Sequence, residues 1–171
     1  MDETLKQPSA TRTDPQNPSA RAFDLPAGGK GASLICLNEG PARNRILETL
    51  TGMGYQVSLP ASSEEVLRGM RFHVYDLVIV DENFATADQT QNQILAHLES
   101  LPMSTRRRMF VAMVSSRFQT NDSLAAFNHS VNIVINPQNI DETDRILRTA
   151  IQENNSFYHV FKETMAKLGR I

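Results

Sequence analysis

Residues 77–80 read LVIV and are followed at once by Asp81. This is the most apolar and β-branched run in the chain. Apolar runs without polar alternation are typical of strands that are covered on both faces. We therefore predict the central strand of a parallel sheet here, with Asp81 at its carboxyl end, which is where ligands and reacting groups gather in such sheets.

Four further short runs predict the rest of the sheet. Residues 33–37 (SLICL) are apolar without alternation, whereas residues 56–59 (QVSL) alternate with period two, as in a half-covered edge strand. Residues 110–114 and 133–135 complete the set. Segments with helical spacing separate the runs, so we predict an α/β fold, a doubly wound five-stranded parallel sheet with helices on both faces.

Composition excludes several classes of function. The 171 residues carry a net charge of -2, so the chain is no polycation for nucleic acid or anionic lipid. No apolar run reaches the roughly 18 residues needed to span a bilayer, and the acidic start (MDET) is unlike a signal peptide. Cys36 alone forms neither an internal disulfide nor a multi-cysteine metal site. We expect a cytoplasmic protein without nucleic-acid or membrane partners.

Three segments are expected along the chain. Residues 1–31 hold four of the eight prolines and few large apolar side chains, which predicts a disordered N-terminal tail. Residues 32–154 form the predicted domain. Residues 155–171 form a C-terminal helical extension, which we expect to begin at a cap in residues 154–156.

The extension has one apolar stripe at helical spacing, made by Phe157, Tyr158, Phe161, Met165 and Leu168. The stripe packs back on the domain in one interpretation. In the other it is a partner or dimer interface, since aromatic residues and Met are favoured in helix-in-groove contacts. The sequence leaves both open.

Three motifs, together with the order of elements, carry a family resemblance over residues 32–154. They are YDLVIVDENF (75–84), FVAMVSS (110–116) and IVINP (133–137). The chain resembles the receiver domain of bacterial two-component response regulators, in an atypical or pseudo-receiver variant. The resemblance implies a flavodoxin-like sheet in the order 2-1-3-4-5. It also implies that Asp81 is the phosphoacceptor and that Ser115 supplies the hydroxyl that binds the phosphoryl group.

The departures from the family pattern concern the metal and the switch. The family's acidic pair falls on Asn38 and Glu39, so one ligand position is degraded and a weak Mg²⁺ site of Glu39, Asp81 and the Asn83 carbonyl is implied. The family's lysine, which precedes a proline, falls on Asn136. No cation then binds the phosphoryl group, although the Asn136 amide could hydrogen-bond to Asp81. The resemblance also implies that the peptide bond between Asn136 and Pro137 is cis. The switch aromatic is replaced by Ile133.

Plainer interpretations exist for several of these residues. Asp81 could be an ordinary strand-end carboxylate, and Glu82 is predicted to be a solvated loop charge. The two serines at 115 and 116 could cap a loop. Arg106, with its two arginine neighbours, is predicted to lie in a solvated loop.

The sequence favours a stand-alone receiver-like signalling module, without an attached DNA-binding domain, that acts through protein–protein contacts and is not an enzyme. Its phosphorylation switch would be degraded. The expected partner is a histidine kinase or another signalling protein, with a homodimer through the C-terminal helix as a further contact. Two alternatives stay open: a functional phosphoacceptor that takes phosphate on Asp81 from a histidine kinase with Mg²⁺, and a small-ligand module that uses the same strand-end cleft.

Overall fold

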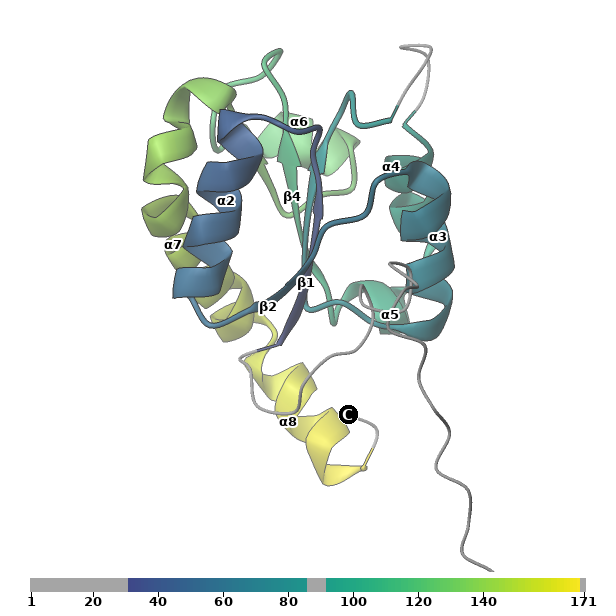
Figure 1. Ribbon diagram of the computed structural model, residues 1–171. Coiled ribbons are helices and arrows are strands. Elements are labelled where there is room, and N and C mark those ends of the chain that lie inside the picture. Colours follow the sequence, from purple (N-terminus) through teal and green to yellow (C-terminus); the bar gives the residue numbers. More distant parts are fainter. Residues whose placement is uncertain (1–30, 86–91, 170–171) are drawn as a thin grey trace, which may run out of the picture.

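The computed structural model describes residues 31–85 and 92–169, and its centre is a parallel sheet (Figure 1). The strands are β1 (Ala32–Cys36), β2 (Gln56–Ser58), β3 (Leu77–Asp81), β4 (Phe110–Val114) and β5 (Ile133–Ile135). All pairings are parallel, in the order β2-β1-β3-β4-β5. The predicted fold class is confirmed, with β2 at the edge. The predicted tail, residues 1–31, lies outside the described residues except for its last position.

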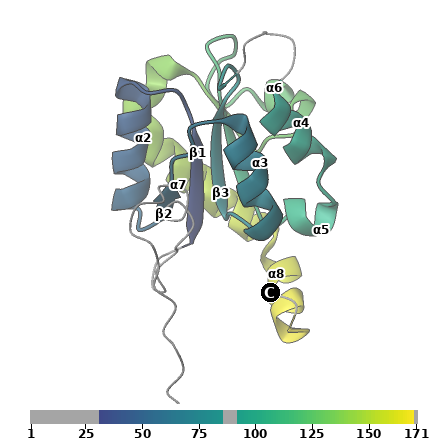
Figure 2. The same cartoon turned by 45° about the vertical axis from the view of Figure 1, so that its right-hand side comes forward.

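Helices cover both faces of this sheet (Figure 2). One face carries α2 (Pro41–Gly52) and α7 (Thr143–Phe157), and the other carries α3 (Ser63–Phe72), α4 (Gln93–Ser100), α5 (Met103–Arg106) and α6 (Ser123–Asn128). A 3-10 turn, η1 (Pro137–Glu142), joins β5 to α7. The sheet is therefore the middle of three layers, which leaves its two ends for chemistry.

The centre of the sheet is buried as the sequence predicts. Leu77 and Ile79 point into the core under α2 and α7, whereas Val78 and Val80 point into the core under the other helices. All four side chains are 0% exposed. Because both faces of β3 are covered, the strand tolerates no polar residue until it leaves the sheet at Asp81.

Local signals mark the start of two helices but not of the last helix of the domain. Pro41 begins α2, and the Ser62 hydroxyl caps α3 by accepting the Glu65 N–H at 3.2 Å. Asp141 is of a residue type that favours helix caps, but it lies within η1, and its carboxylate is 3.5 Å from Arg45. No cap interrupts residues 154–156, because α7 continues to Phe157.

The predicted C-terminal helix exists as α8 (His159–Lys167) and projects from the body (Figure 1). Tyr158 lies between α7 and α8, and its N–H and C=O continue the helical bonding to Asn154 and Lys162. No residue of α8 is buried. Its ring contact with the body is Phe161, whose centroid lies 5.3 Å from the Arg107 guanidinium. The division at residue 154 stays a prediction.

Arg106 is not in a solvated loop, so that prediction is wrong. Its Nη1 donates to the Met109 carbonyl at 2.9 Å, and its Nη2 donates to the Ser130 carbonyl at 2.8 Å and to Asn132 Oδ1 at 3.1 Å. The guanidinium thus joins the end of α5 to the loop that enters β5. Arg107 and Arg108 are exposed, as predicted.

Within the described ranges, none of the helices has both the length and the apolar character that a membrane crossing requires.

Candidate functional site

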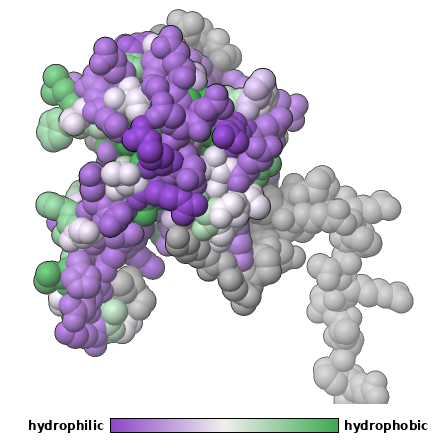
Figure 3. All heavy atoms as spheres, turned by 90° about the vertical axis from the view of Figure 1, so that its left-hand side faces the viewer, coloured by the Kyte–Doolittle hydropathy of each residue, from purple (hydrophilic) through white to green (hydrophobic). Residues whose placement is uncertain are grey.

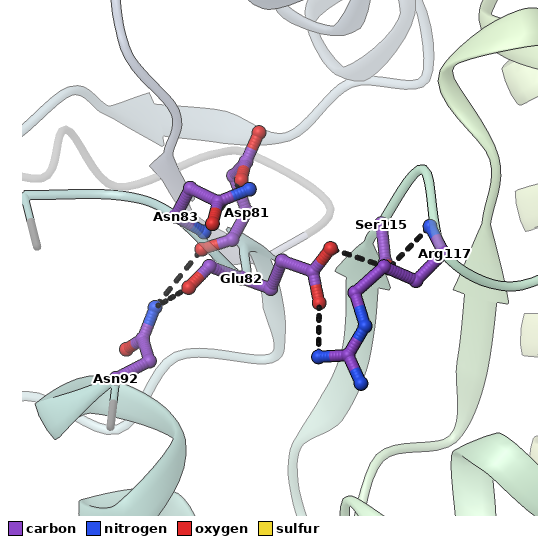
Figure 4. A network of polar contacts seen from close by, with 6 residues as sticks. All are labelled: Asp81, Glu82, Asn83, Asn92, Ser115 and Arg117. Atoms are coloured by element: carbon purple, nitrogen blue, oxygen red, sulfur yellow. Dashed lines mark hydrogen bonds and ion pairs between the residues drawn. The ribbon is translucent and has the colours of Figure 1, made fainter. Parts of the chain in front are cut away.

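The carboxyl ends of β1, β3 and β4 bring the predicted site residues to one edge of the sheet. Asp81 pairs with Val114, and the next N–H, that of Glu82, donates to the Val114 carbonyl at 3.1 Å. Ser115 therefore lies beside Glu82 (Figure 4). Cys36 pairs with Val80, so the segment after β1, with the predicted ligands Asn38 and Glu39, leaves the sheet at the same edge.

Asp81 is partly buried, and the charged side chain that acts on it is the acidic Glu82. Its Oδ1 accepts the Asn83 N–H at 2.7 Å. Burial raises the pKa of Asp81 above its ordinary value, the Asn83 N–H opposes this shift, and the charge of Glu82 adds to it. In the described part of the chain, Asp81 forms no ion pair. The carboxylate thus has no cation beside it to favour a further negative charge.

Glu82 is drawn into the structure, so its prediction as a solvated charge is wrong. Its side chain is only 10% exposed, and Oε1 accepts the hydroxyl proton of Ser115 at 2.7 Å. Oε2 lies 3.6 Å from the Arg117 guanidinium. Ser115 in turn accepts the Arg117 N–H at 3.1 Å. The hydroxyl that was predicted to bind a phosphoryl group on Asp81 is therefore held by Glu82.

Asn92 is a site residue that the sequence reasoning missed. Its Nδ2 donates to the carbonyls of Asp81 at 3.0 Å and Glu82 at 3.1 Å, while its Oδ1 accepts the N–H groups of Ile94 and Leu95 at the start of α4. The signal that could have found it is an Asn directly before a helical apolar stripe, which is typical of an N-cap.

Asn136 does not hydrogen-bond to Asp81, so that hypothesis is wrong. Its Nδ2 donates to the Phe118 carbonyl at 2.7 Å, and its Oδ1 accepts the Gln138 N–H at 3.0 Å as the cap of η1. The peptide bond to Pro137 is trans, like every other peptide bond in the described ranges, so the implied cis bond is also wrong. The amide serves the turn after β5 and not the acidic site.

Two of the implied Mg²⁺ ligands are engaged with other groups. The Glu39 side chain is 91% exposed and lies 3.6 Å from the Arg43 guanidinium. Asn38 is exposed, and Asp81 Oδ1 accepts the Asn83 N–H. The described residues contain no group of three acidic, His or Cys side chains that could hold a metal ion, whereas the implied set has only two such side chains and a backbone carbonyl. The ligand set of Glu39, Asp81 and the Asn83 carbonyl therefore stays a prediction.

Comparison with known proteins shows the fold. No protein-family model matches the chain, and neither does any curated protein. Among solved structures, a CheY-like response regulator receiver domain from Methylobacillus flagellatus is 23% identical, with a TM-score of 0.52 over 70% of this chain and 97% of that one. A putative response regulator from Chloroflexus aurantiacus is 21% identical, with a TM-score of 0.52 over 69% of this chain and 98% of that one.

A third neighbour is the receiver domain of a sensor histidine kinase from Pseudomonas aeruginosa, whose structure has a magnesium ion coordinated in the active site cleft. It is 19% identical, with a TM-score of 0.52 over 71% of this chain and 98% of that one. At these identities the likeness concerns the fold, and the fold is that of response regulator receiver domains.

Proposed function

We propose that this receiver-fold chain is a signalling module that works through protein–protein contacts and in which the phosphorylation switch is degraded. The observation that carries the proposal is the position of Asn136. At the lysine position stands a neutral amide that is committed to Phe118 and Gln138. Asp81 is left beside Glu82 with no partner of opposite charge in the described residues.

The chemistry of phosphoryl transfer explains why this matters. An incoming phosphoryl group spreads negative charge over its oxygens, and catalysis depends on cations placed against them. Here the Glu82 carboxylate already raises the pKa of Asp81 by its charge, and it would repel such a group. The Ser115 hydroxyl, which could donate to it, already donates to Glu82.

Two exposed apolar surfaces support contact with other proteins. Around α8, three large apolar side chains are exposed: Phe157 at the end of α7, Val160 on α8 and Leu168 directly after it. On α6, Leu124 and Phe127 are exposed. Figure 3 shows the face of α2 and α7 as mainly hydrophilic, with hydrophobic side chains on the projecting part below. Large apolar side chains gathered on otherwise polar surfaces mark interaction sites. The partners we propose are a histidine kinase or another signalling protein, and a second copy of this chain at α8.

Incubation with acetyl phosphate and Mg²⁺ tests the degraded switch. We expect no phosphate-sized gain in the intact mass of the protein, whereas a competent receiver domain treated in parallel gains one. A gain in the wild-type chain that is absent in Asp81→Asn would overturn the proposal. It would favour the second candidate, a phosphoacceptor that takes phosphate from a histidine kinase with Mg²⁺. The observation in favour of that candidate is the partly exposed carboxylate of Asp81 at the end of β3.

Removal of α8 tests the contact surface. A chain that ends at Tyr158 should unfold at nearly the same urea concentration as the full chain, because α8 buries no residue. Its self-association, measured by sedimentation velocity, should be lost. Val160→Glu should weaken association in the same way, while Glu163→Gln, on the same helix, should not. A large loss of stability on truncation would show instead that α8 packs on the domain.

A further inference from the structure

Glu82 places a fixed negative charge where the loop after β4 begins. Its backbone N–H is bonded to Val114, so the residue is anchored to β4 before its side chain reaches the Ser115 hydroxyl. The Glu82 side chain is 10% exposed and Ser115 is 2% exposed, so both are almost fully covered. Both lie between the ends of β3 and β4 (Figure 4). The Glu82 carboxylate is therefore held in one position, whereas a charged side chain on a surface loop is not.

The chemistry of this contact is that of an anion bound by a hydroxyl. A phosphoryl group and a carboxylate are both anions whose oxygens accept a hydrogen bond from a hydroxyl. Only one acceptor can take the single Ser115 proton. In this chain Glu82 takes it, 2.7 Å away.

We infer that the Glu82 carboxylate is a built-in substitute for the phosphoryl group, which holds the Ser115 hydroxyl and fixes the loop after β4 without phosphorylation. The inference rests on the proposed function and names how its site is regulated. The module would therefore present one conformation of this loop at all times.

The contact extends well beyond the two side chains. Ser115 accepts the Arg117 N–H at 3.1 Å, and the Arg117 guanidinium lies 5.2 Å from the centroid of the Phe118 ring. The Phe118 carbonyl accepts the Asn136 amide, and its ring lies 5.5 Å from that of His129 at the end of α6. A continuous set of contacts thus joins Glu82, directly after β3, to the end of β5 and to α6.

The ion pair with Arg117 does not by itself explain the arrangement. The Arg117 side chain is 69% exposed and 3.6 Å from the carboxylate, and pairs of this kind contribute little in water. A covered carboxylate needs hydrogen bonds to offset the loss of hydration. The Ser115 hydroxyl supplies the short one, so we assign the holding of the loop to the hydroxyl contact.

Hydrogen exchange of the wild-type chain and of Glu82→Ala, without any phosphoryl donor, tests the inference. We expect the Arg117 amide to exchange roughly tenfold faster in Glu82→Ala, the size expected when a hydrogen bond to a charged group is lost. The amide NMR signals of residues 116–120 should shift as well. Ser115→Ala should speed the exchange of the Arg117 amide at least as much, because it removes both the contact with Glu82 and the oxygen that accepts the Arg117 N–H. Adding Glu82→Ala to Ser115→Ala should change neither readout further, because the Glu82 contact is then already lost.

Two controls keep the result interpretable. Glu82→Gln keeps the side-chain length and an acceptor oxygen, so its loop signals should stay close to those of the wild type even if the alanine variant unfolds. Glu99→Gln removes an exposed charge from α4, which lines the same pocket as Glu82 and Arg117, and should change neither readout. Unchanged exchange at Arg117 in Glu82→Ala, or additive effects of the two alanine substitutions, would overturn the inference. A mass gain on Asp81 would overturn only the degraded switch.

Discussion

Replacing Arg106 by alanine is expected to lower the free energy of unfolding by about 2–4 kcal/mol. The guanidinium donates to two carbonyls and one side-chain oxygen, and these acceptors belong to segments far apart in the sequence. Burial lowers the pKa of Arg106, a sign that water does not replace these partners freely. Removal of the side chain leaves the carbonyls of Met109 and Ser130 without their donor, and unpaired buried acceptors are expensive.

Urea unfolding followed by circular dichroism measures this effect. Arg108→Ala is the matched control, since that neighbour is exposed, and its change should stay within about 0.5 kcal/mol. Arg106→Lys should recover only a small part of the loss, because an ammonium cannot reach three acceptors with the geometry of a guanidinium fork. Equal effects of the alanine substitutions at 106 and 108 would contradict this account.

Replacing Asn92 by alanine is expected to destabilise the protein by about 2–3 kcal/mol. This side chain has two tasks at once, since its oxygen caps α4 and its amide nitrogen supports the turn that carries Asp81 and Glu82. A helix cap alone contributes about 1 kcal/mol. The rest comes from the two backbone carbonyls that lose their donor in a part-buried setting.

Asp122→Ala separates the two tasks. Asp122 caps α6 by accepting the Ala125 N–H at 2.9 Å, and no contact to the acidic site is recorded for it in the described residues. Its loss should therefore approach about 1 kcal/mol, measured by the same urea unfolding. If Asn92→Ala destabilised no more than Asp122→Ala, the support of the turn after β3 would contribute nothing.

Much of the fold could be predicted because its signals are local. The runs at 110–114 and 133–135 form strands with the predicted bounds, and the apolar run before Asp81 forms the central one. Helix ends were harder to predict. Asparagine and serine at 154–156 resemble a cap, but the backbone bonds of Tyr158 to Asn154 and Lys162 carry the helix onward. Local preference is a weak guide wherever bonding along a helix can override it.

The candidate site was predicted only in part, since its residues come from separate strands. Asp81 and Ser115 lie at one sheet edge, as the parallel order requires. The hydrogen-bond partners of each polar group could not be predicted from the sequence. Asn136 looked available to Asp81 but is bonded to Phe118 and Gln138. Which donor meets which acceptor depends on side-chain directions that are set only once the strands are in register.

The α/β class, the position of Asp81 at the end of a buried strand and the neutral residue at 136 could all be inferred without coordinates. These follow from apolar periodicity and from residue identity, which need no knowledge of neighbours in space. That Glu82 is covered and holds Ser115, 33 positions away, became known from the folded arrangement alone. A carboxylate next to a strand end is solvated or buried according to the donor that the adjacent strand presents to it, and the sequence does not show which strand is adjacent.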